Sequence, residues 1–144
     1  MPSAPPALLI PVTADLGGLE RARLQARQFL ESHGVDGPAV AAVELVLEEA
    51  VTNVLRYGYE ITDADPHAIE IDLQVDRDEV QLLIVDDARA FDPLEGGGVV
   101  LPDSLDEAKV GGLGLLMIRN TASRLRYERR DDHNRLALSI ARSA

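Results

Sequence analysis

The stretch at residues 69–86 reads IEIDLQVDRDEVQLLIVD. From Ile69 to Val75, isoleucine, leucine and valine alternate with polar residues, which is the two-residue period of a strand with one exposed face. The polar run 76–79 predicts a short turn, and 80–86 predicts a second strand. Strands joined by so short a connection pair antiparallel. The stretch therefore predicts an antiparallel hairpin, which favours a mostly antiparallel sheet.

The remaining elements follow from two periodicities of the apolar residues, that of helices and that of strands. Apolar residues recur at helical spacing in some segments and alternate in others. Because helices and strands do not alternate regularly along the chain, a doubly wound fold is excluded. We predict an α+β fold with helices on one face of a mostly antiparallel mixed sheet. The expected elements are a strand at 8–12, a helix from the cap Asp15 to Gly34, a helix from the cap Asp36 to Gly58, a glycine-rich helix start at 111–115, and closing strands at 125–129 and 136–140.

Length, charge and composition limit the possible functions. The 144 residues suit a single domain, predicted over 1–144 with a loose arm at 1–6. The 25 acidic residues outnumber the 14 basic ones, and the net charge of −11 argues against nucleic acid and membranes as partners. The absence of cysteine excludes thiolate metal sites and a cysteine nucleophile. No apolar run approaches the roughly 18 residues of a membrane span, and 1–6 lack the order of a signal peptide, so we expect a cytoplasmic protein.

Asp86 is the first candidate site residue. It is in phase with Val80, Leu82 and Ile84 on its predicted strand, so its carboxylate is expected to point toward the apolar layer under the helices. A carboxylate there is costly unless a donor meets it, and an exocyclic amine such as that of adenine is one such donor. The alternative is a cap or turn residue at the start of the following loop. Asp87 is expected to point the other way.

Glu49 and Asn53 form a second candidate pair on the helix that begins at Asp36. They are four residues apart, so they stack on one edge of the helix where its apolar stripe ends. A carboxylate and an amide in that place can line a cleft and offer oxygens to a hard cation such as Mg²⁺. The alternative is a solvated glutamate beside a boundary asparagine.

The third candidate is the glycine-rich run Gly111-Gly112-Leu113-Gly114-Leu115. Glycines at a helix start expose backbone N–H groups that, with the helix dipole, can bind phosphate, although such turns precede many helices. No Gly-Lys-Ser/Thr follows, so a P-loop is excluded. The preceding segment 94–110 has three consecutive glycines and predicts a mobile lid. Lys109, the only lysine, could pair with a terminal phosphate or simply be solvated.

An arginine cluster marks the first closing strand. Its default explanation is a solvated edge that discourages sheet-to-sheet pairing, and the alternative is a docking patch for an acidic partner. Its members are Arg124, Arg126, Arg129 and Arg130.

Three motifs in order resemble a known family. Glu49-Ala50-Val51-Thr52-Asn53, the run from Asp86 to Phe91-Asp92-Pro93, and Gly111–Ile118 resemble the N, G1 and G2 boxes of the GHKL (Bergerat-fold) ATPases. Within that superfamily the sequence is most similar to bacterial anti-sigma-factor serine/threonine-protein kinases, over nearly the whole chain. The resemblance implies a two-layer α/β sandwich of the histidine-kinase-like ATPase type.

The resemblance also implies roles for residues. Glu49 would be the catalytic base that accepts the proton of a serine hydroxyl, and Asn53 would be the Mg²⁺ ligand. Asp86 would accept from the adenine amine. Ala88, Tyr57 and Ala137 depart from the family, which commonly has glycine, histidine and threonine there. The resemblance places Ala137, on the last strand, near the nucleotide. The full nucleotide-binding set implied is Asn53, Asp86, Ala88, Lys109, Gly111, Gly112, Leu113, Gly114 and Leu115, with ATP and Mg²⁺ as cofactors.

The partners implied by the resemblance belong to a partner-switching system. They are a STAS-domain anti-anti-sigma protein that carries the acceptor serine, a sigma factor, and a second copy of the chain in a homodimer. One alternative is a nucleotide-binding or degenerate module that sequesters a sigma factor or other regulator without turnover. Another is the catalytic fragment of a sensor kinase, which the lack of a phosphoacceptor-histidine helix hairpin disfavours.

Overall fold

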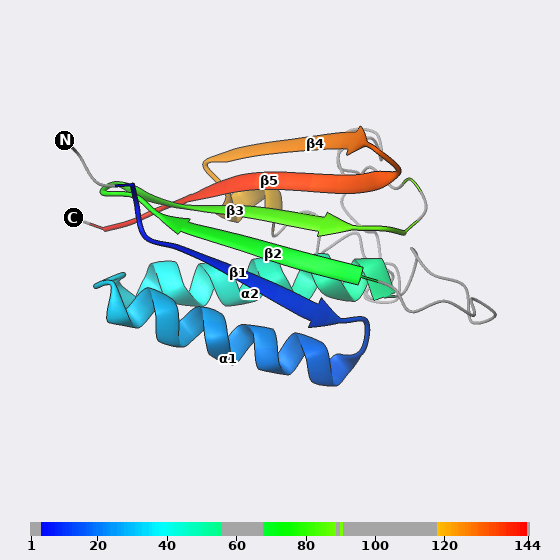
Figure 1. The fold of residues 1–144 in the computed structure, drawn as a ribbon. Coiled ribbons are helices and arrows are strands. Elements are labelled where there is room, and N and C mark those ends of the chain that lie inside the picture. Colours follow the sequence, from blue (N-terminus) through cyan, green and yellow to red (C-terminus); the bar gives the residue numbers. More distant parts are fainter. Residues whose placement is uncertain (1–3, 56–67, 89, 91–117, 144) are drawn as a thin grey trace, which may run out of the picture.

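The computed structural model describes residues 4–55, 68–88, 90 and 118–143, and these form two layers (Figure 1). One layer is a five-stranded sheet and the other is a pair of helices that covers one of its faces. This confirms the predicted α+β fold. In chain order the elements are β1 (Ala7–Thr13), α1 (Leu16–Ser32), α2 (Gly37–Asn53), β2 (Ala68–Val75), β3 (Glu79–Asp86), β4 (Arg124–Arg130) and β5 (His133–Ala141).

The sheet has the strand order β1-β2-β3-β5-β4. The predicted hairpin is confirmed as β2 and β3, with Ile71 opposite Ile84. Every strand pair in the described sheet is antiparallel. We expected a mixed sheet, but the described strands form no parallel pair. Because β5 inserts between β3 and β4, the strand that ends at Asp86 lies beside the last strand of the chain.

Both helices begin at the caps expected from the sequence. The Asp15 carboxylate accepts a hydrogen bond of 2.6 Å from the backbone N–H of Gly18, and Asp36 accepts one of 3.1 Å from Ala39. These bonds satisfy N–H groups that have no partner within the helix. Gly34 follows α1 with a φ of +74°, a value that favours glycine. Helical structure continues past Asn53 through 54–55, and the expected extension to Gly58 lies outside the described residues.

The hydrophobic core lies between the helices and the sheet. The alternation read from the sequence is confirmed, because every second side chain of β2 and β3 is buried under the helices. Ile118, which follows a long part of the chain outside the described residues, is buried in the same core. The largest fully buried side chains are Ile10, Leu30, Leu47, Ile69, Ile71, Leu73, Ile84, Val43, Val46, Val51 and Val80. None of the described helices is both long and apolar enough to cross a membrane.

The start of α1 lies close against the end of β1, and this makes Gly18 sensitive to substitution. A Cβ atom at Gly18 would lie 2.1 Å from the Thr13 carbonyl oxygen, whereas one at Gly37, at the start of α2, would meet nothing within 4 Å. We therefore expect Gly18→Ala to lower the free energy of unfolding by about 1–3 kcal/mol, despite the higher helix propensity of alanine.

Gly37→Ala is the matched control, and it should leave stability unchanged or raise it by up to about 1 kcal/mol. Urea unfolding of both variants measures the difference. Equal stability of the two variants would contradict the close approach of Gly18 to the β1 backbone.

Candidate functional site

The candidate site is built around Asp86, the last residue of β3. Only 5% of Asp86 is exposed, which confirms the inward orientation expected from its phase. Figure 1 shows that the end of β3 and the C-terminal end of α2 lie on the same side of the molecule. The carboxylate therefore lies at one end of the layer between the sheet and the helices.

The two hydrogen bonds that described residues donate to the Asp86 carboxylate end on the same oxygen. Oδ1 accepts from the backbone N–H of Ala88 at 3.0 Å and from Nδ2 of Asn134 at 2.8 Å. Burial raises the pKa of Asp86, while these two donors and the charge of Arg129 act to lower it. Oδ2 receives no hydrogen bond from the described part of the chain. The carboxylate is thus held in place and keeps one oxygen for another donor.

Asn134 is a site residue that our sequence analysis missed. It lies on β5 directly opposite Asp86, and only 5% of it is exposed. Its Oδ1 accepts from the Tyr127 hydroxyl at 2.5 Å and from Arg129 Nη1 at 3.1 Å. The signal was available, because Asn134 is in phase with the apolar residues of its strand, as Asp86 is with those of β3.

The structure corrects the expected position of Ala137. Ala137 was expected near the nucleotide, but it pairs with Leu83 on the sheet face that the helices leave uncovered. Side chains of neighbouring residues on a strand point to opposite faces, so Ala137 and Asn134, three residues apart, do not share a face. The position beside Asp86 is held by Asn134.

The two residues that follow Asp86 are held by hydrogen bonds to other strands of the sheet. Ala88 is buried, and its carbonyl oxygen accepts a hydrogen bond of 2.7 Å from Arg129 Nη1. Asp87 is half-buried, and its Oδ1 accepts from the backbone N–H of Ala68 at 3.2 Å. The departure at Ala88 therefore lies at the site, where the methyl group is packed against its surroundings.

The last turn of α2 carries the second part of the candidate site. Asn53 is 7% exposed, and its side chain forms no hydrogen bond with any residue that the structure describes. Glu49, one turn earlier, is half-buried, whereas Glu48 is exposed. A buried amide without a partner among the described residues fits a ligand that supplies the missing contact, such as Mg²⁺ coordinated by oxygens. The roles of Glu49 and Asn53 stay predictions.

The phosphate-binding part of the prediction is not tested by the structure. Lys109, the run Gly111–Leu115 and the predicted lid at 94–110 lie outside the described residues. Tyr57 and Phe91-Asp92-Pro93 lie outside them as well. Within the described ranges, no group of three His, Asp or Glu side chains could hold a metal ion by itself.

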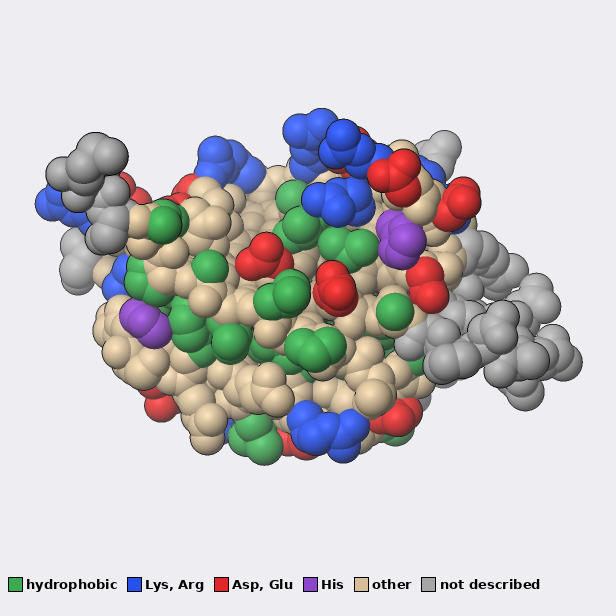
Figure 2. Space-filling view, viewed as in Figure 1, with side chains coloured by type: hydrophobic (Ala, Val, Ile, Leu, Met, Phe, Trp, Pro, Cys, Tyr) green, Lys and Arg blue, Asp and Glu red, His purple; other side chains and the backbone are tan. Residues whose placement is uncertain are grey.

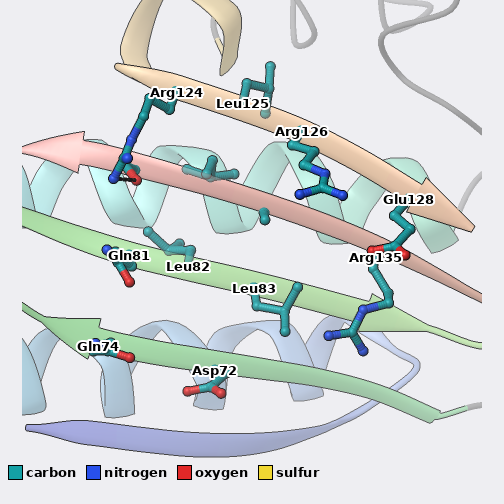
Figure 3. Close-up of a pocket in the computed structure, with 13 residues that line it drawn as sticks. Asp72, Gln74, Gln81, Leu82, Leu83, Arg124, Leu125, Arg126, Glu128 and Arg135 are labelled. Carbon is teal, nitrogen blue, oxygen red and sulfur yellow. Dashed lines mark hydrogen bonds between the residues drawn. The ribbon is translucent and has the colours of Figure 1, made fainter. Parts of the chain in front are cut away.

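A separate hollow of about 510 Å³ lies on the uncovered face of the sheet (Figure 3). Arg124 and Arg126 of β4 and Arg135 of β5 reach over it, with Asp72 on the opposite side. Arg124 forms an ion pair with Glu79. Figure 2 shows basic side chains gathered along the β4 edge and acidic ones nearer the middle of this view. Arg129 differs from the rest of the predicted arginine cluster, because it contacts the Asp86 site instead.

Comparisons with known proteins agree with this arrangement. A family model described as a histidine kinase-like ATPase domain matches residues 12–140. Over 95 residues the chain is 38% identical to the serine/threonine-protein kinase BtrW of Bordetella bronchiseptica, a match that covers 66% of each protein.

A solved structure shows the same fold at lower sequence identity. It contains the RsbU and RsbW domains of a Mycobacterium tuberculosis protein, and it superposes with a TM-score of 0.68 at 19% identity. The superposition covers 96% of this chain and 33% of that one. Since the family model spans nearly all of the sequence, the chain belongs to the family of histidine kinase-like ATPase domains.

Proposed function

We propose that the chain binds ATP with Mg²⁺ and is a protein serine/threonine kinase that acts as an anti-sigma factor in a bacterial partner-switching system. The observation that carries the proposal is the buried Asp86 carboxylate, held on one oxygen by Ala88 and Asn134 and left with the other as an acceptor. Membership of an ATPase family and the similarity to a serine/threonine-protein kinase support it.

In the proposed complex, Asp86 accepts a hydrogen bond from the amino group of adenine. Asn53 contributes its amide oxygen to Mg²⁺, which fits its burial without a described partner. The resemblance assigns the phosphates to Gly111–Leu115 and Lys109. Mg²⁺ held by Asn53 would neutralise charge on the phosphate oxygens.

In the proposed reaction, a serine Oγ of the partner protein forms a bond to the γ-phosphorus of ATP. The bond from that phosphorus to the bridging oxygen breaks, and ADP leaves with the electron pair. Glu49 accepts the proton of the serine hydroxyl. Phosphoryl transfer depends mainly on positioning and charge stabilisation, so no covalent intermediate with this chain is needed.

The proposed protein partners rest on the resemblance. The acceptor serine belongs to a STAS-domain anti-anti-sigma protein, the second partner is a sigma factor, and the encounter takes place in the cytoplasm. A second candidate function, a module that binds nucleotide and sequesters its partner without turnover, is favoured by one observation. Ala88 places a buried methyl group beside Asp86, where the family commonly has glycine.

The proposed homodimer has a suitable surface in the uncovered face of the sheet. Arg126 on β4 and Asp72 on β2 lie on opposite sides of Leu83 in one row across the strands. Leu83 and Ala137 are the two middle residues of this row, so two copies related by a two-fold axis between them can place the arginine of each over the aspartate of the other. Opposite charges that meet in this way favour the paired state.

We expect Arg126→Glu to shift the protein toward monomer by about tenfold in the dissociation constant, because it sets like charges against each other. Sedimentation equilibrium measures this shift, and Arg23→Glu on α1 is the control. A dimer of unchanged strength in Arg126→Glu would exclude this face, and a monomeric wild-type protein would exclude the homodimer.

The adenine contact is tested by Asp86→Asn. The amide replaces one acceptor oxygen by a donor, and loss of a hydrogen bond to a charged group typically costs about 1.5–3 kcal/mol. We expect ATP binding to weaken correspondingly in calorimetric titrations with Mg²⁺ present. Asp72→Asn removes an exposed carboxylate on the other face of the sheet and should bind ATP like the wild type. Unchanged affinity in Asp86→Asn would refute the adenine assignment.

The roles on α2 are tested by Glu49→Ala and Asn53→Ala. Glu49→Ala should lower phosphoryl transfer from γ-labelled ATP to a STAS protein by about 10²–10⁴-fold while ATP binding persists. Glu48→Ala, one residue away and exposed, should retain activity. Asn53→Ala should weaken the binding of ATP in the presence of Mg²⁺.

Transfer at the wild-type rate by Glu49→Ala would remove Glu49 from the chemistry. If the wild-type chain binds ATP but transfers phosphate to none of the STAS proteins of its own genome, the module without turnover becomes the better description.

A further inference from the structure

Three polar residues lie in one row across the end of the sheet. Asp86 on β3 is opposite Asn134 on β5, and Asn134 is opposite Arg129 on β4. The two-residue turn formed by Asp131 and Asp132 fixes this register. Both turn residues have positive φ, 52° and 61°, as the tight hairpin turn requires. The row is therefore set by the backbone of the hairpin rather than by a flexible loop.

The hydrogen bonds in this row fix the orientation of the Asn134 amide. The Tyr127 hydroxyl and Arg129 Nη1 both contact one end of the Asn134 amide, and a guanidinium can only donate. The contacted end must therefore be the carbonyl oxygen, and the amide nitrogen must face Asp86 Oδ1 at 2.8 Å. A flipped amide would set two donors against each other. Arg129 also donates to the Ala88 carbonyl oxygen at 2.7 Å, which ties β4 to the residues that follow Asp86.

We propose that Asn134, oriented by Arg129 and Tyr127, is a positioning residue that keeps Asp86 an acceptor and so makes the site select a purine with a 6-amino group. This inference rests on the proposed function, because it assigns the nucleotide specificity of the same site. With Oδ1 occupied by two donors, Oδ2 presents lone pairs to the nucleotide. It accepts from the 6-amino group of ATP and repels the 6-oxo group of ITP.

The charges around Asp86 explain why Asn134 matters. Burial raises the pKa of Asp86, and the charge of Asp87, directly after the strand, also raises it. The hydrogen bonds donated by Asn134 and Ala88 and the charge of Arg129 lower it. Tyr127, Arg130 and His133 on the last hairpin and Glu49 on α2 are further ionisable groups on the described elements at this end. Without Asn134, Asp86 loses a donor and takes up a proton more readily as the pH falls. A protonated Asp86 can donate to a 6-oxo group, so the preference for ATP over ITP would shrink.

The test compares the binding of ATP and ITP to the full chain by calorimetry with Mg²⁺ present, at about pH 8 and about pH 6. For the wild type we expect a strong preference for ATP that is the same at both pH values. For Asn134→Ala we expect ATP binding to weaken about tenfold and the ATP:ITP preference to fall further at the lower pH. Asn134→Thr retains a hydroxyl donor and should restore part of the preference.

The controls separate this role from a structural one. Ser139→Ala removes another buried polar group of β5, which donates nothing to Asp86, and it should leave the preference unchanged at both pH values. Arg129→Gln changes an exposed side chain, so it can replace Asn134→Ala in the test if that variant fails to fold. The ATP:ITP preference of Arg129→Gln should also be lower than that of the wild type.

The outcomes distinguish the inference from the function on which it rests. A wild-type protein that binds no ATP would overturn the proposed function. Suppose that the wild type binds ATP and that Asn134→Ala and Arg129→Gln keep the wild-type ATP:ITP preference at both pH values. This result would overturn only the role of Asn134.

Discussion

The structure depends on a carboxylate buried at the end of a strand. A charged group under a helix layer is tolerated only when donors meet it, so Asp86 requires Ala88, Asn134 and, through Asn134, Arg129 in their places. This requirement links the loop after β3 to the last hairpin of the chain. It also leaves one oxygen of Asp86 as an acceptor at one end of the layer between the sheet and the helices. A group that satisfies this oxygen must be a donor.

The sheet supplies the rigidity that such a site needs. β3 pairs on both sides, with β2 and β5, and β5 is held in turn by β4. Asn134 therefore lies on a strand with neighbours on both sides, and its amide is fixed by two donors from the edge strand. A site on paired strands holds its geometry more closely than one on loops. The residues assigned to phosphate lie elsewhere in the sequence, which divides recognition of the base from recognition of the phosphates.

The two faces of the sheet serve different purposes. The covered face carries the core and the polar row at its end, while the uncovered face carries the hollow, with arginines on β4 and β5 and Asp72 on β2. Strand alternation separates them, because neighbouring residues belong to different faces. Arg126 and Arg129, read from the sequence as one cluster, are divided in this way, and only Arg129 contacts the candidate site.

Local sequence patterns predicted the strands and helices that the structure describes, the caps of both helices and the inward orientation of Asp86, because apolar period and capping residues are local properties of the chain. It also led to the family, through three short motifs in order. The tertiary structure decided the strand order, and with it the neighbours of Asp86. Asn134 lies 48 residues from Asp86 along the chain, and no local pattern says that β5 inserts between β3 and β4. For the same reason Ala137 was placed at the nucleotide from the sequence, whereas the register sets it on the opposite face.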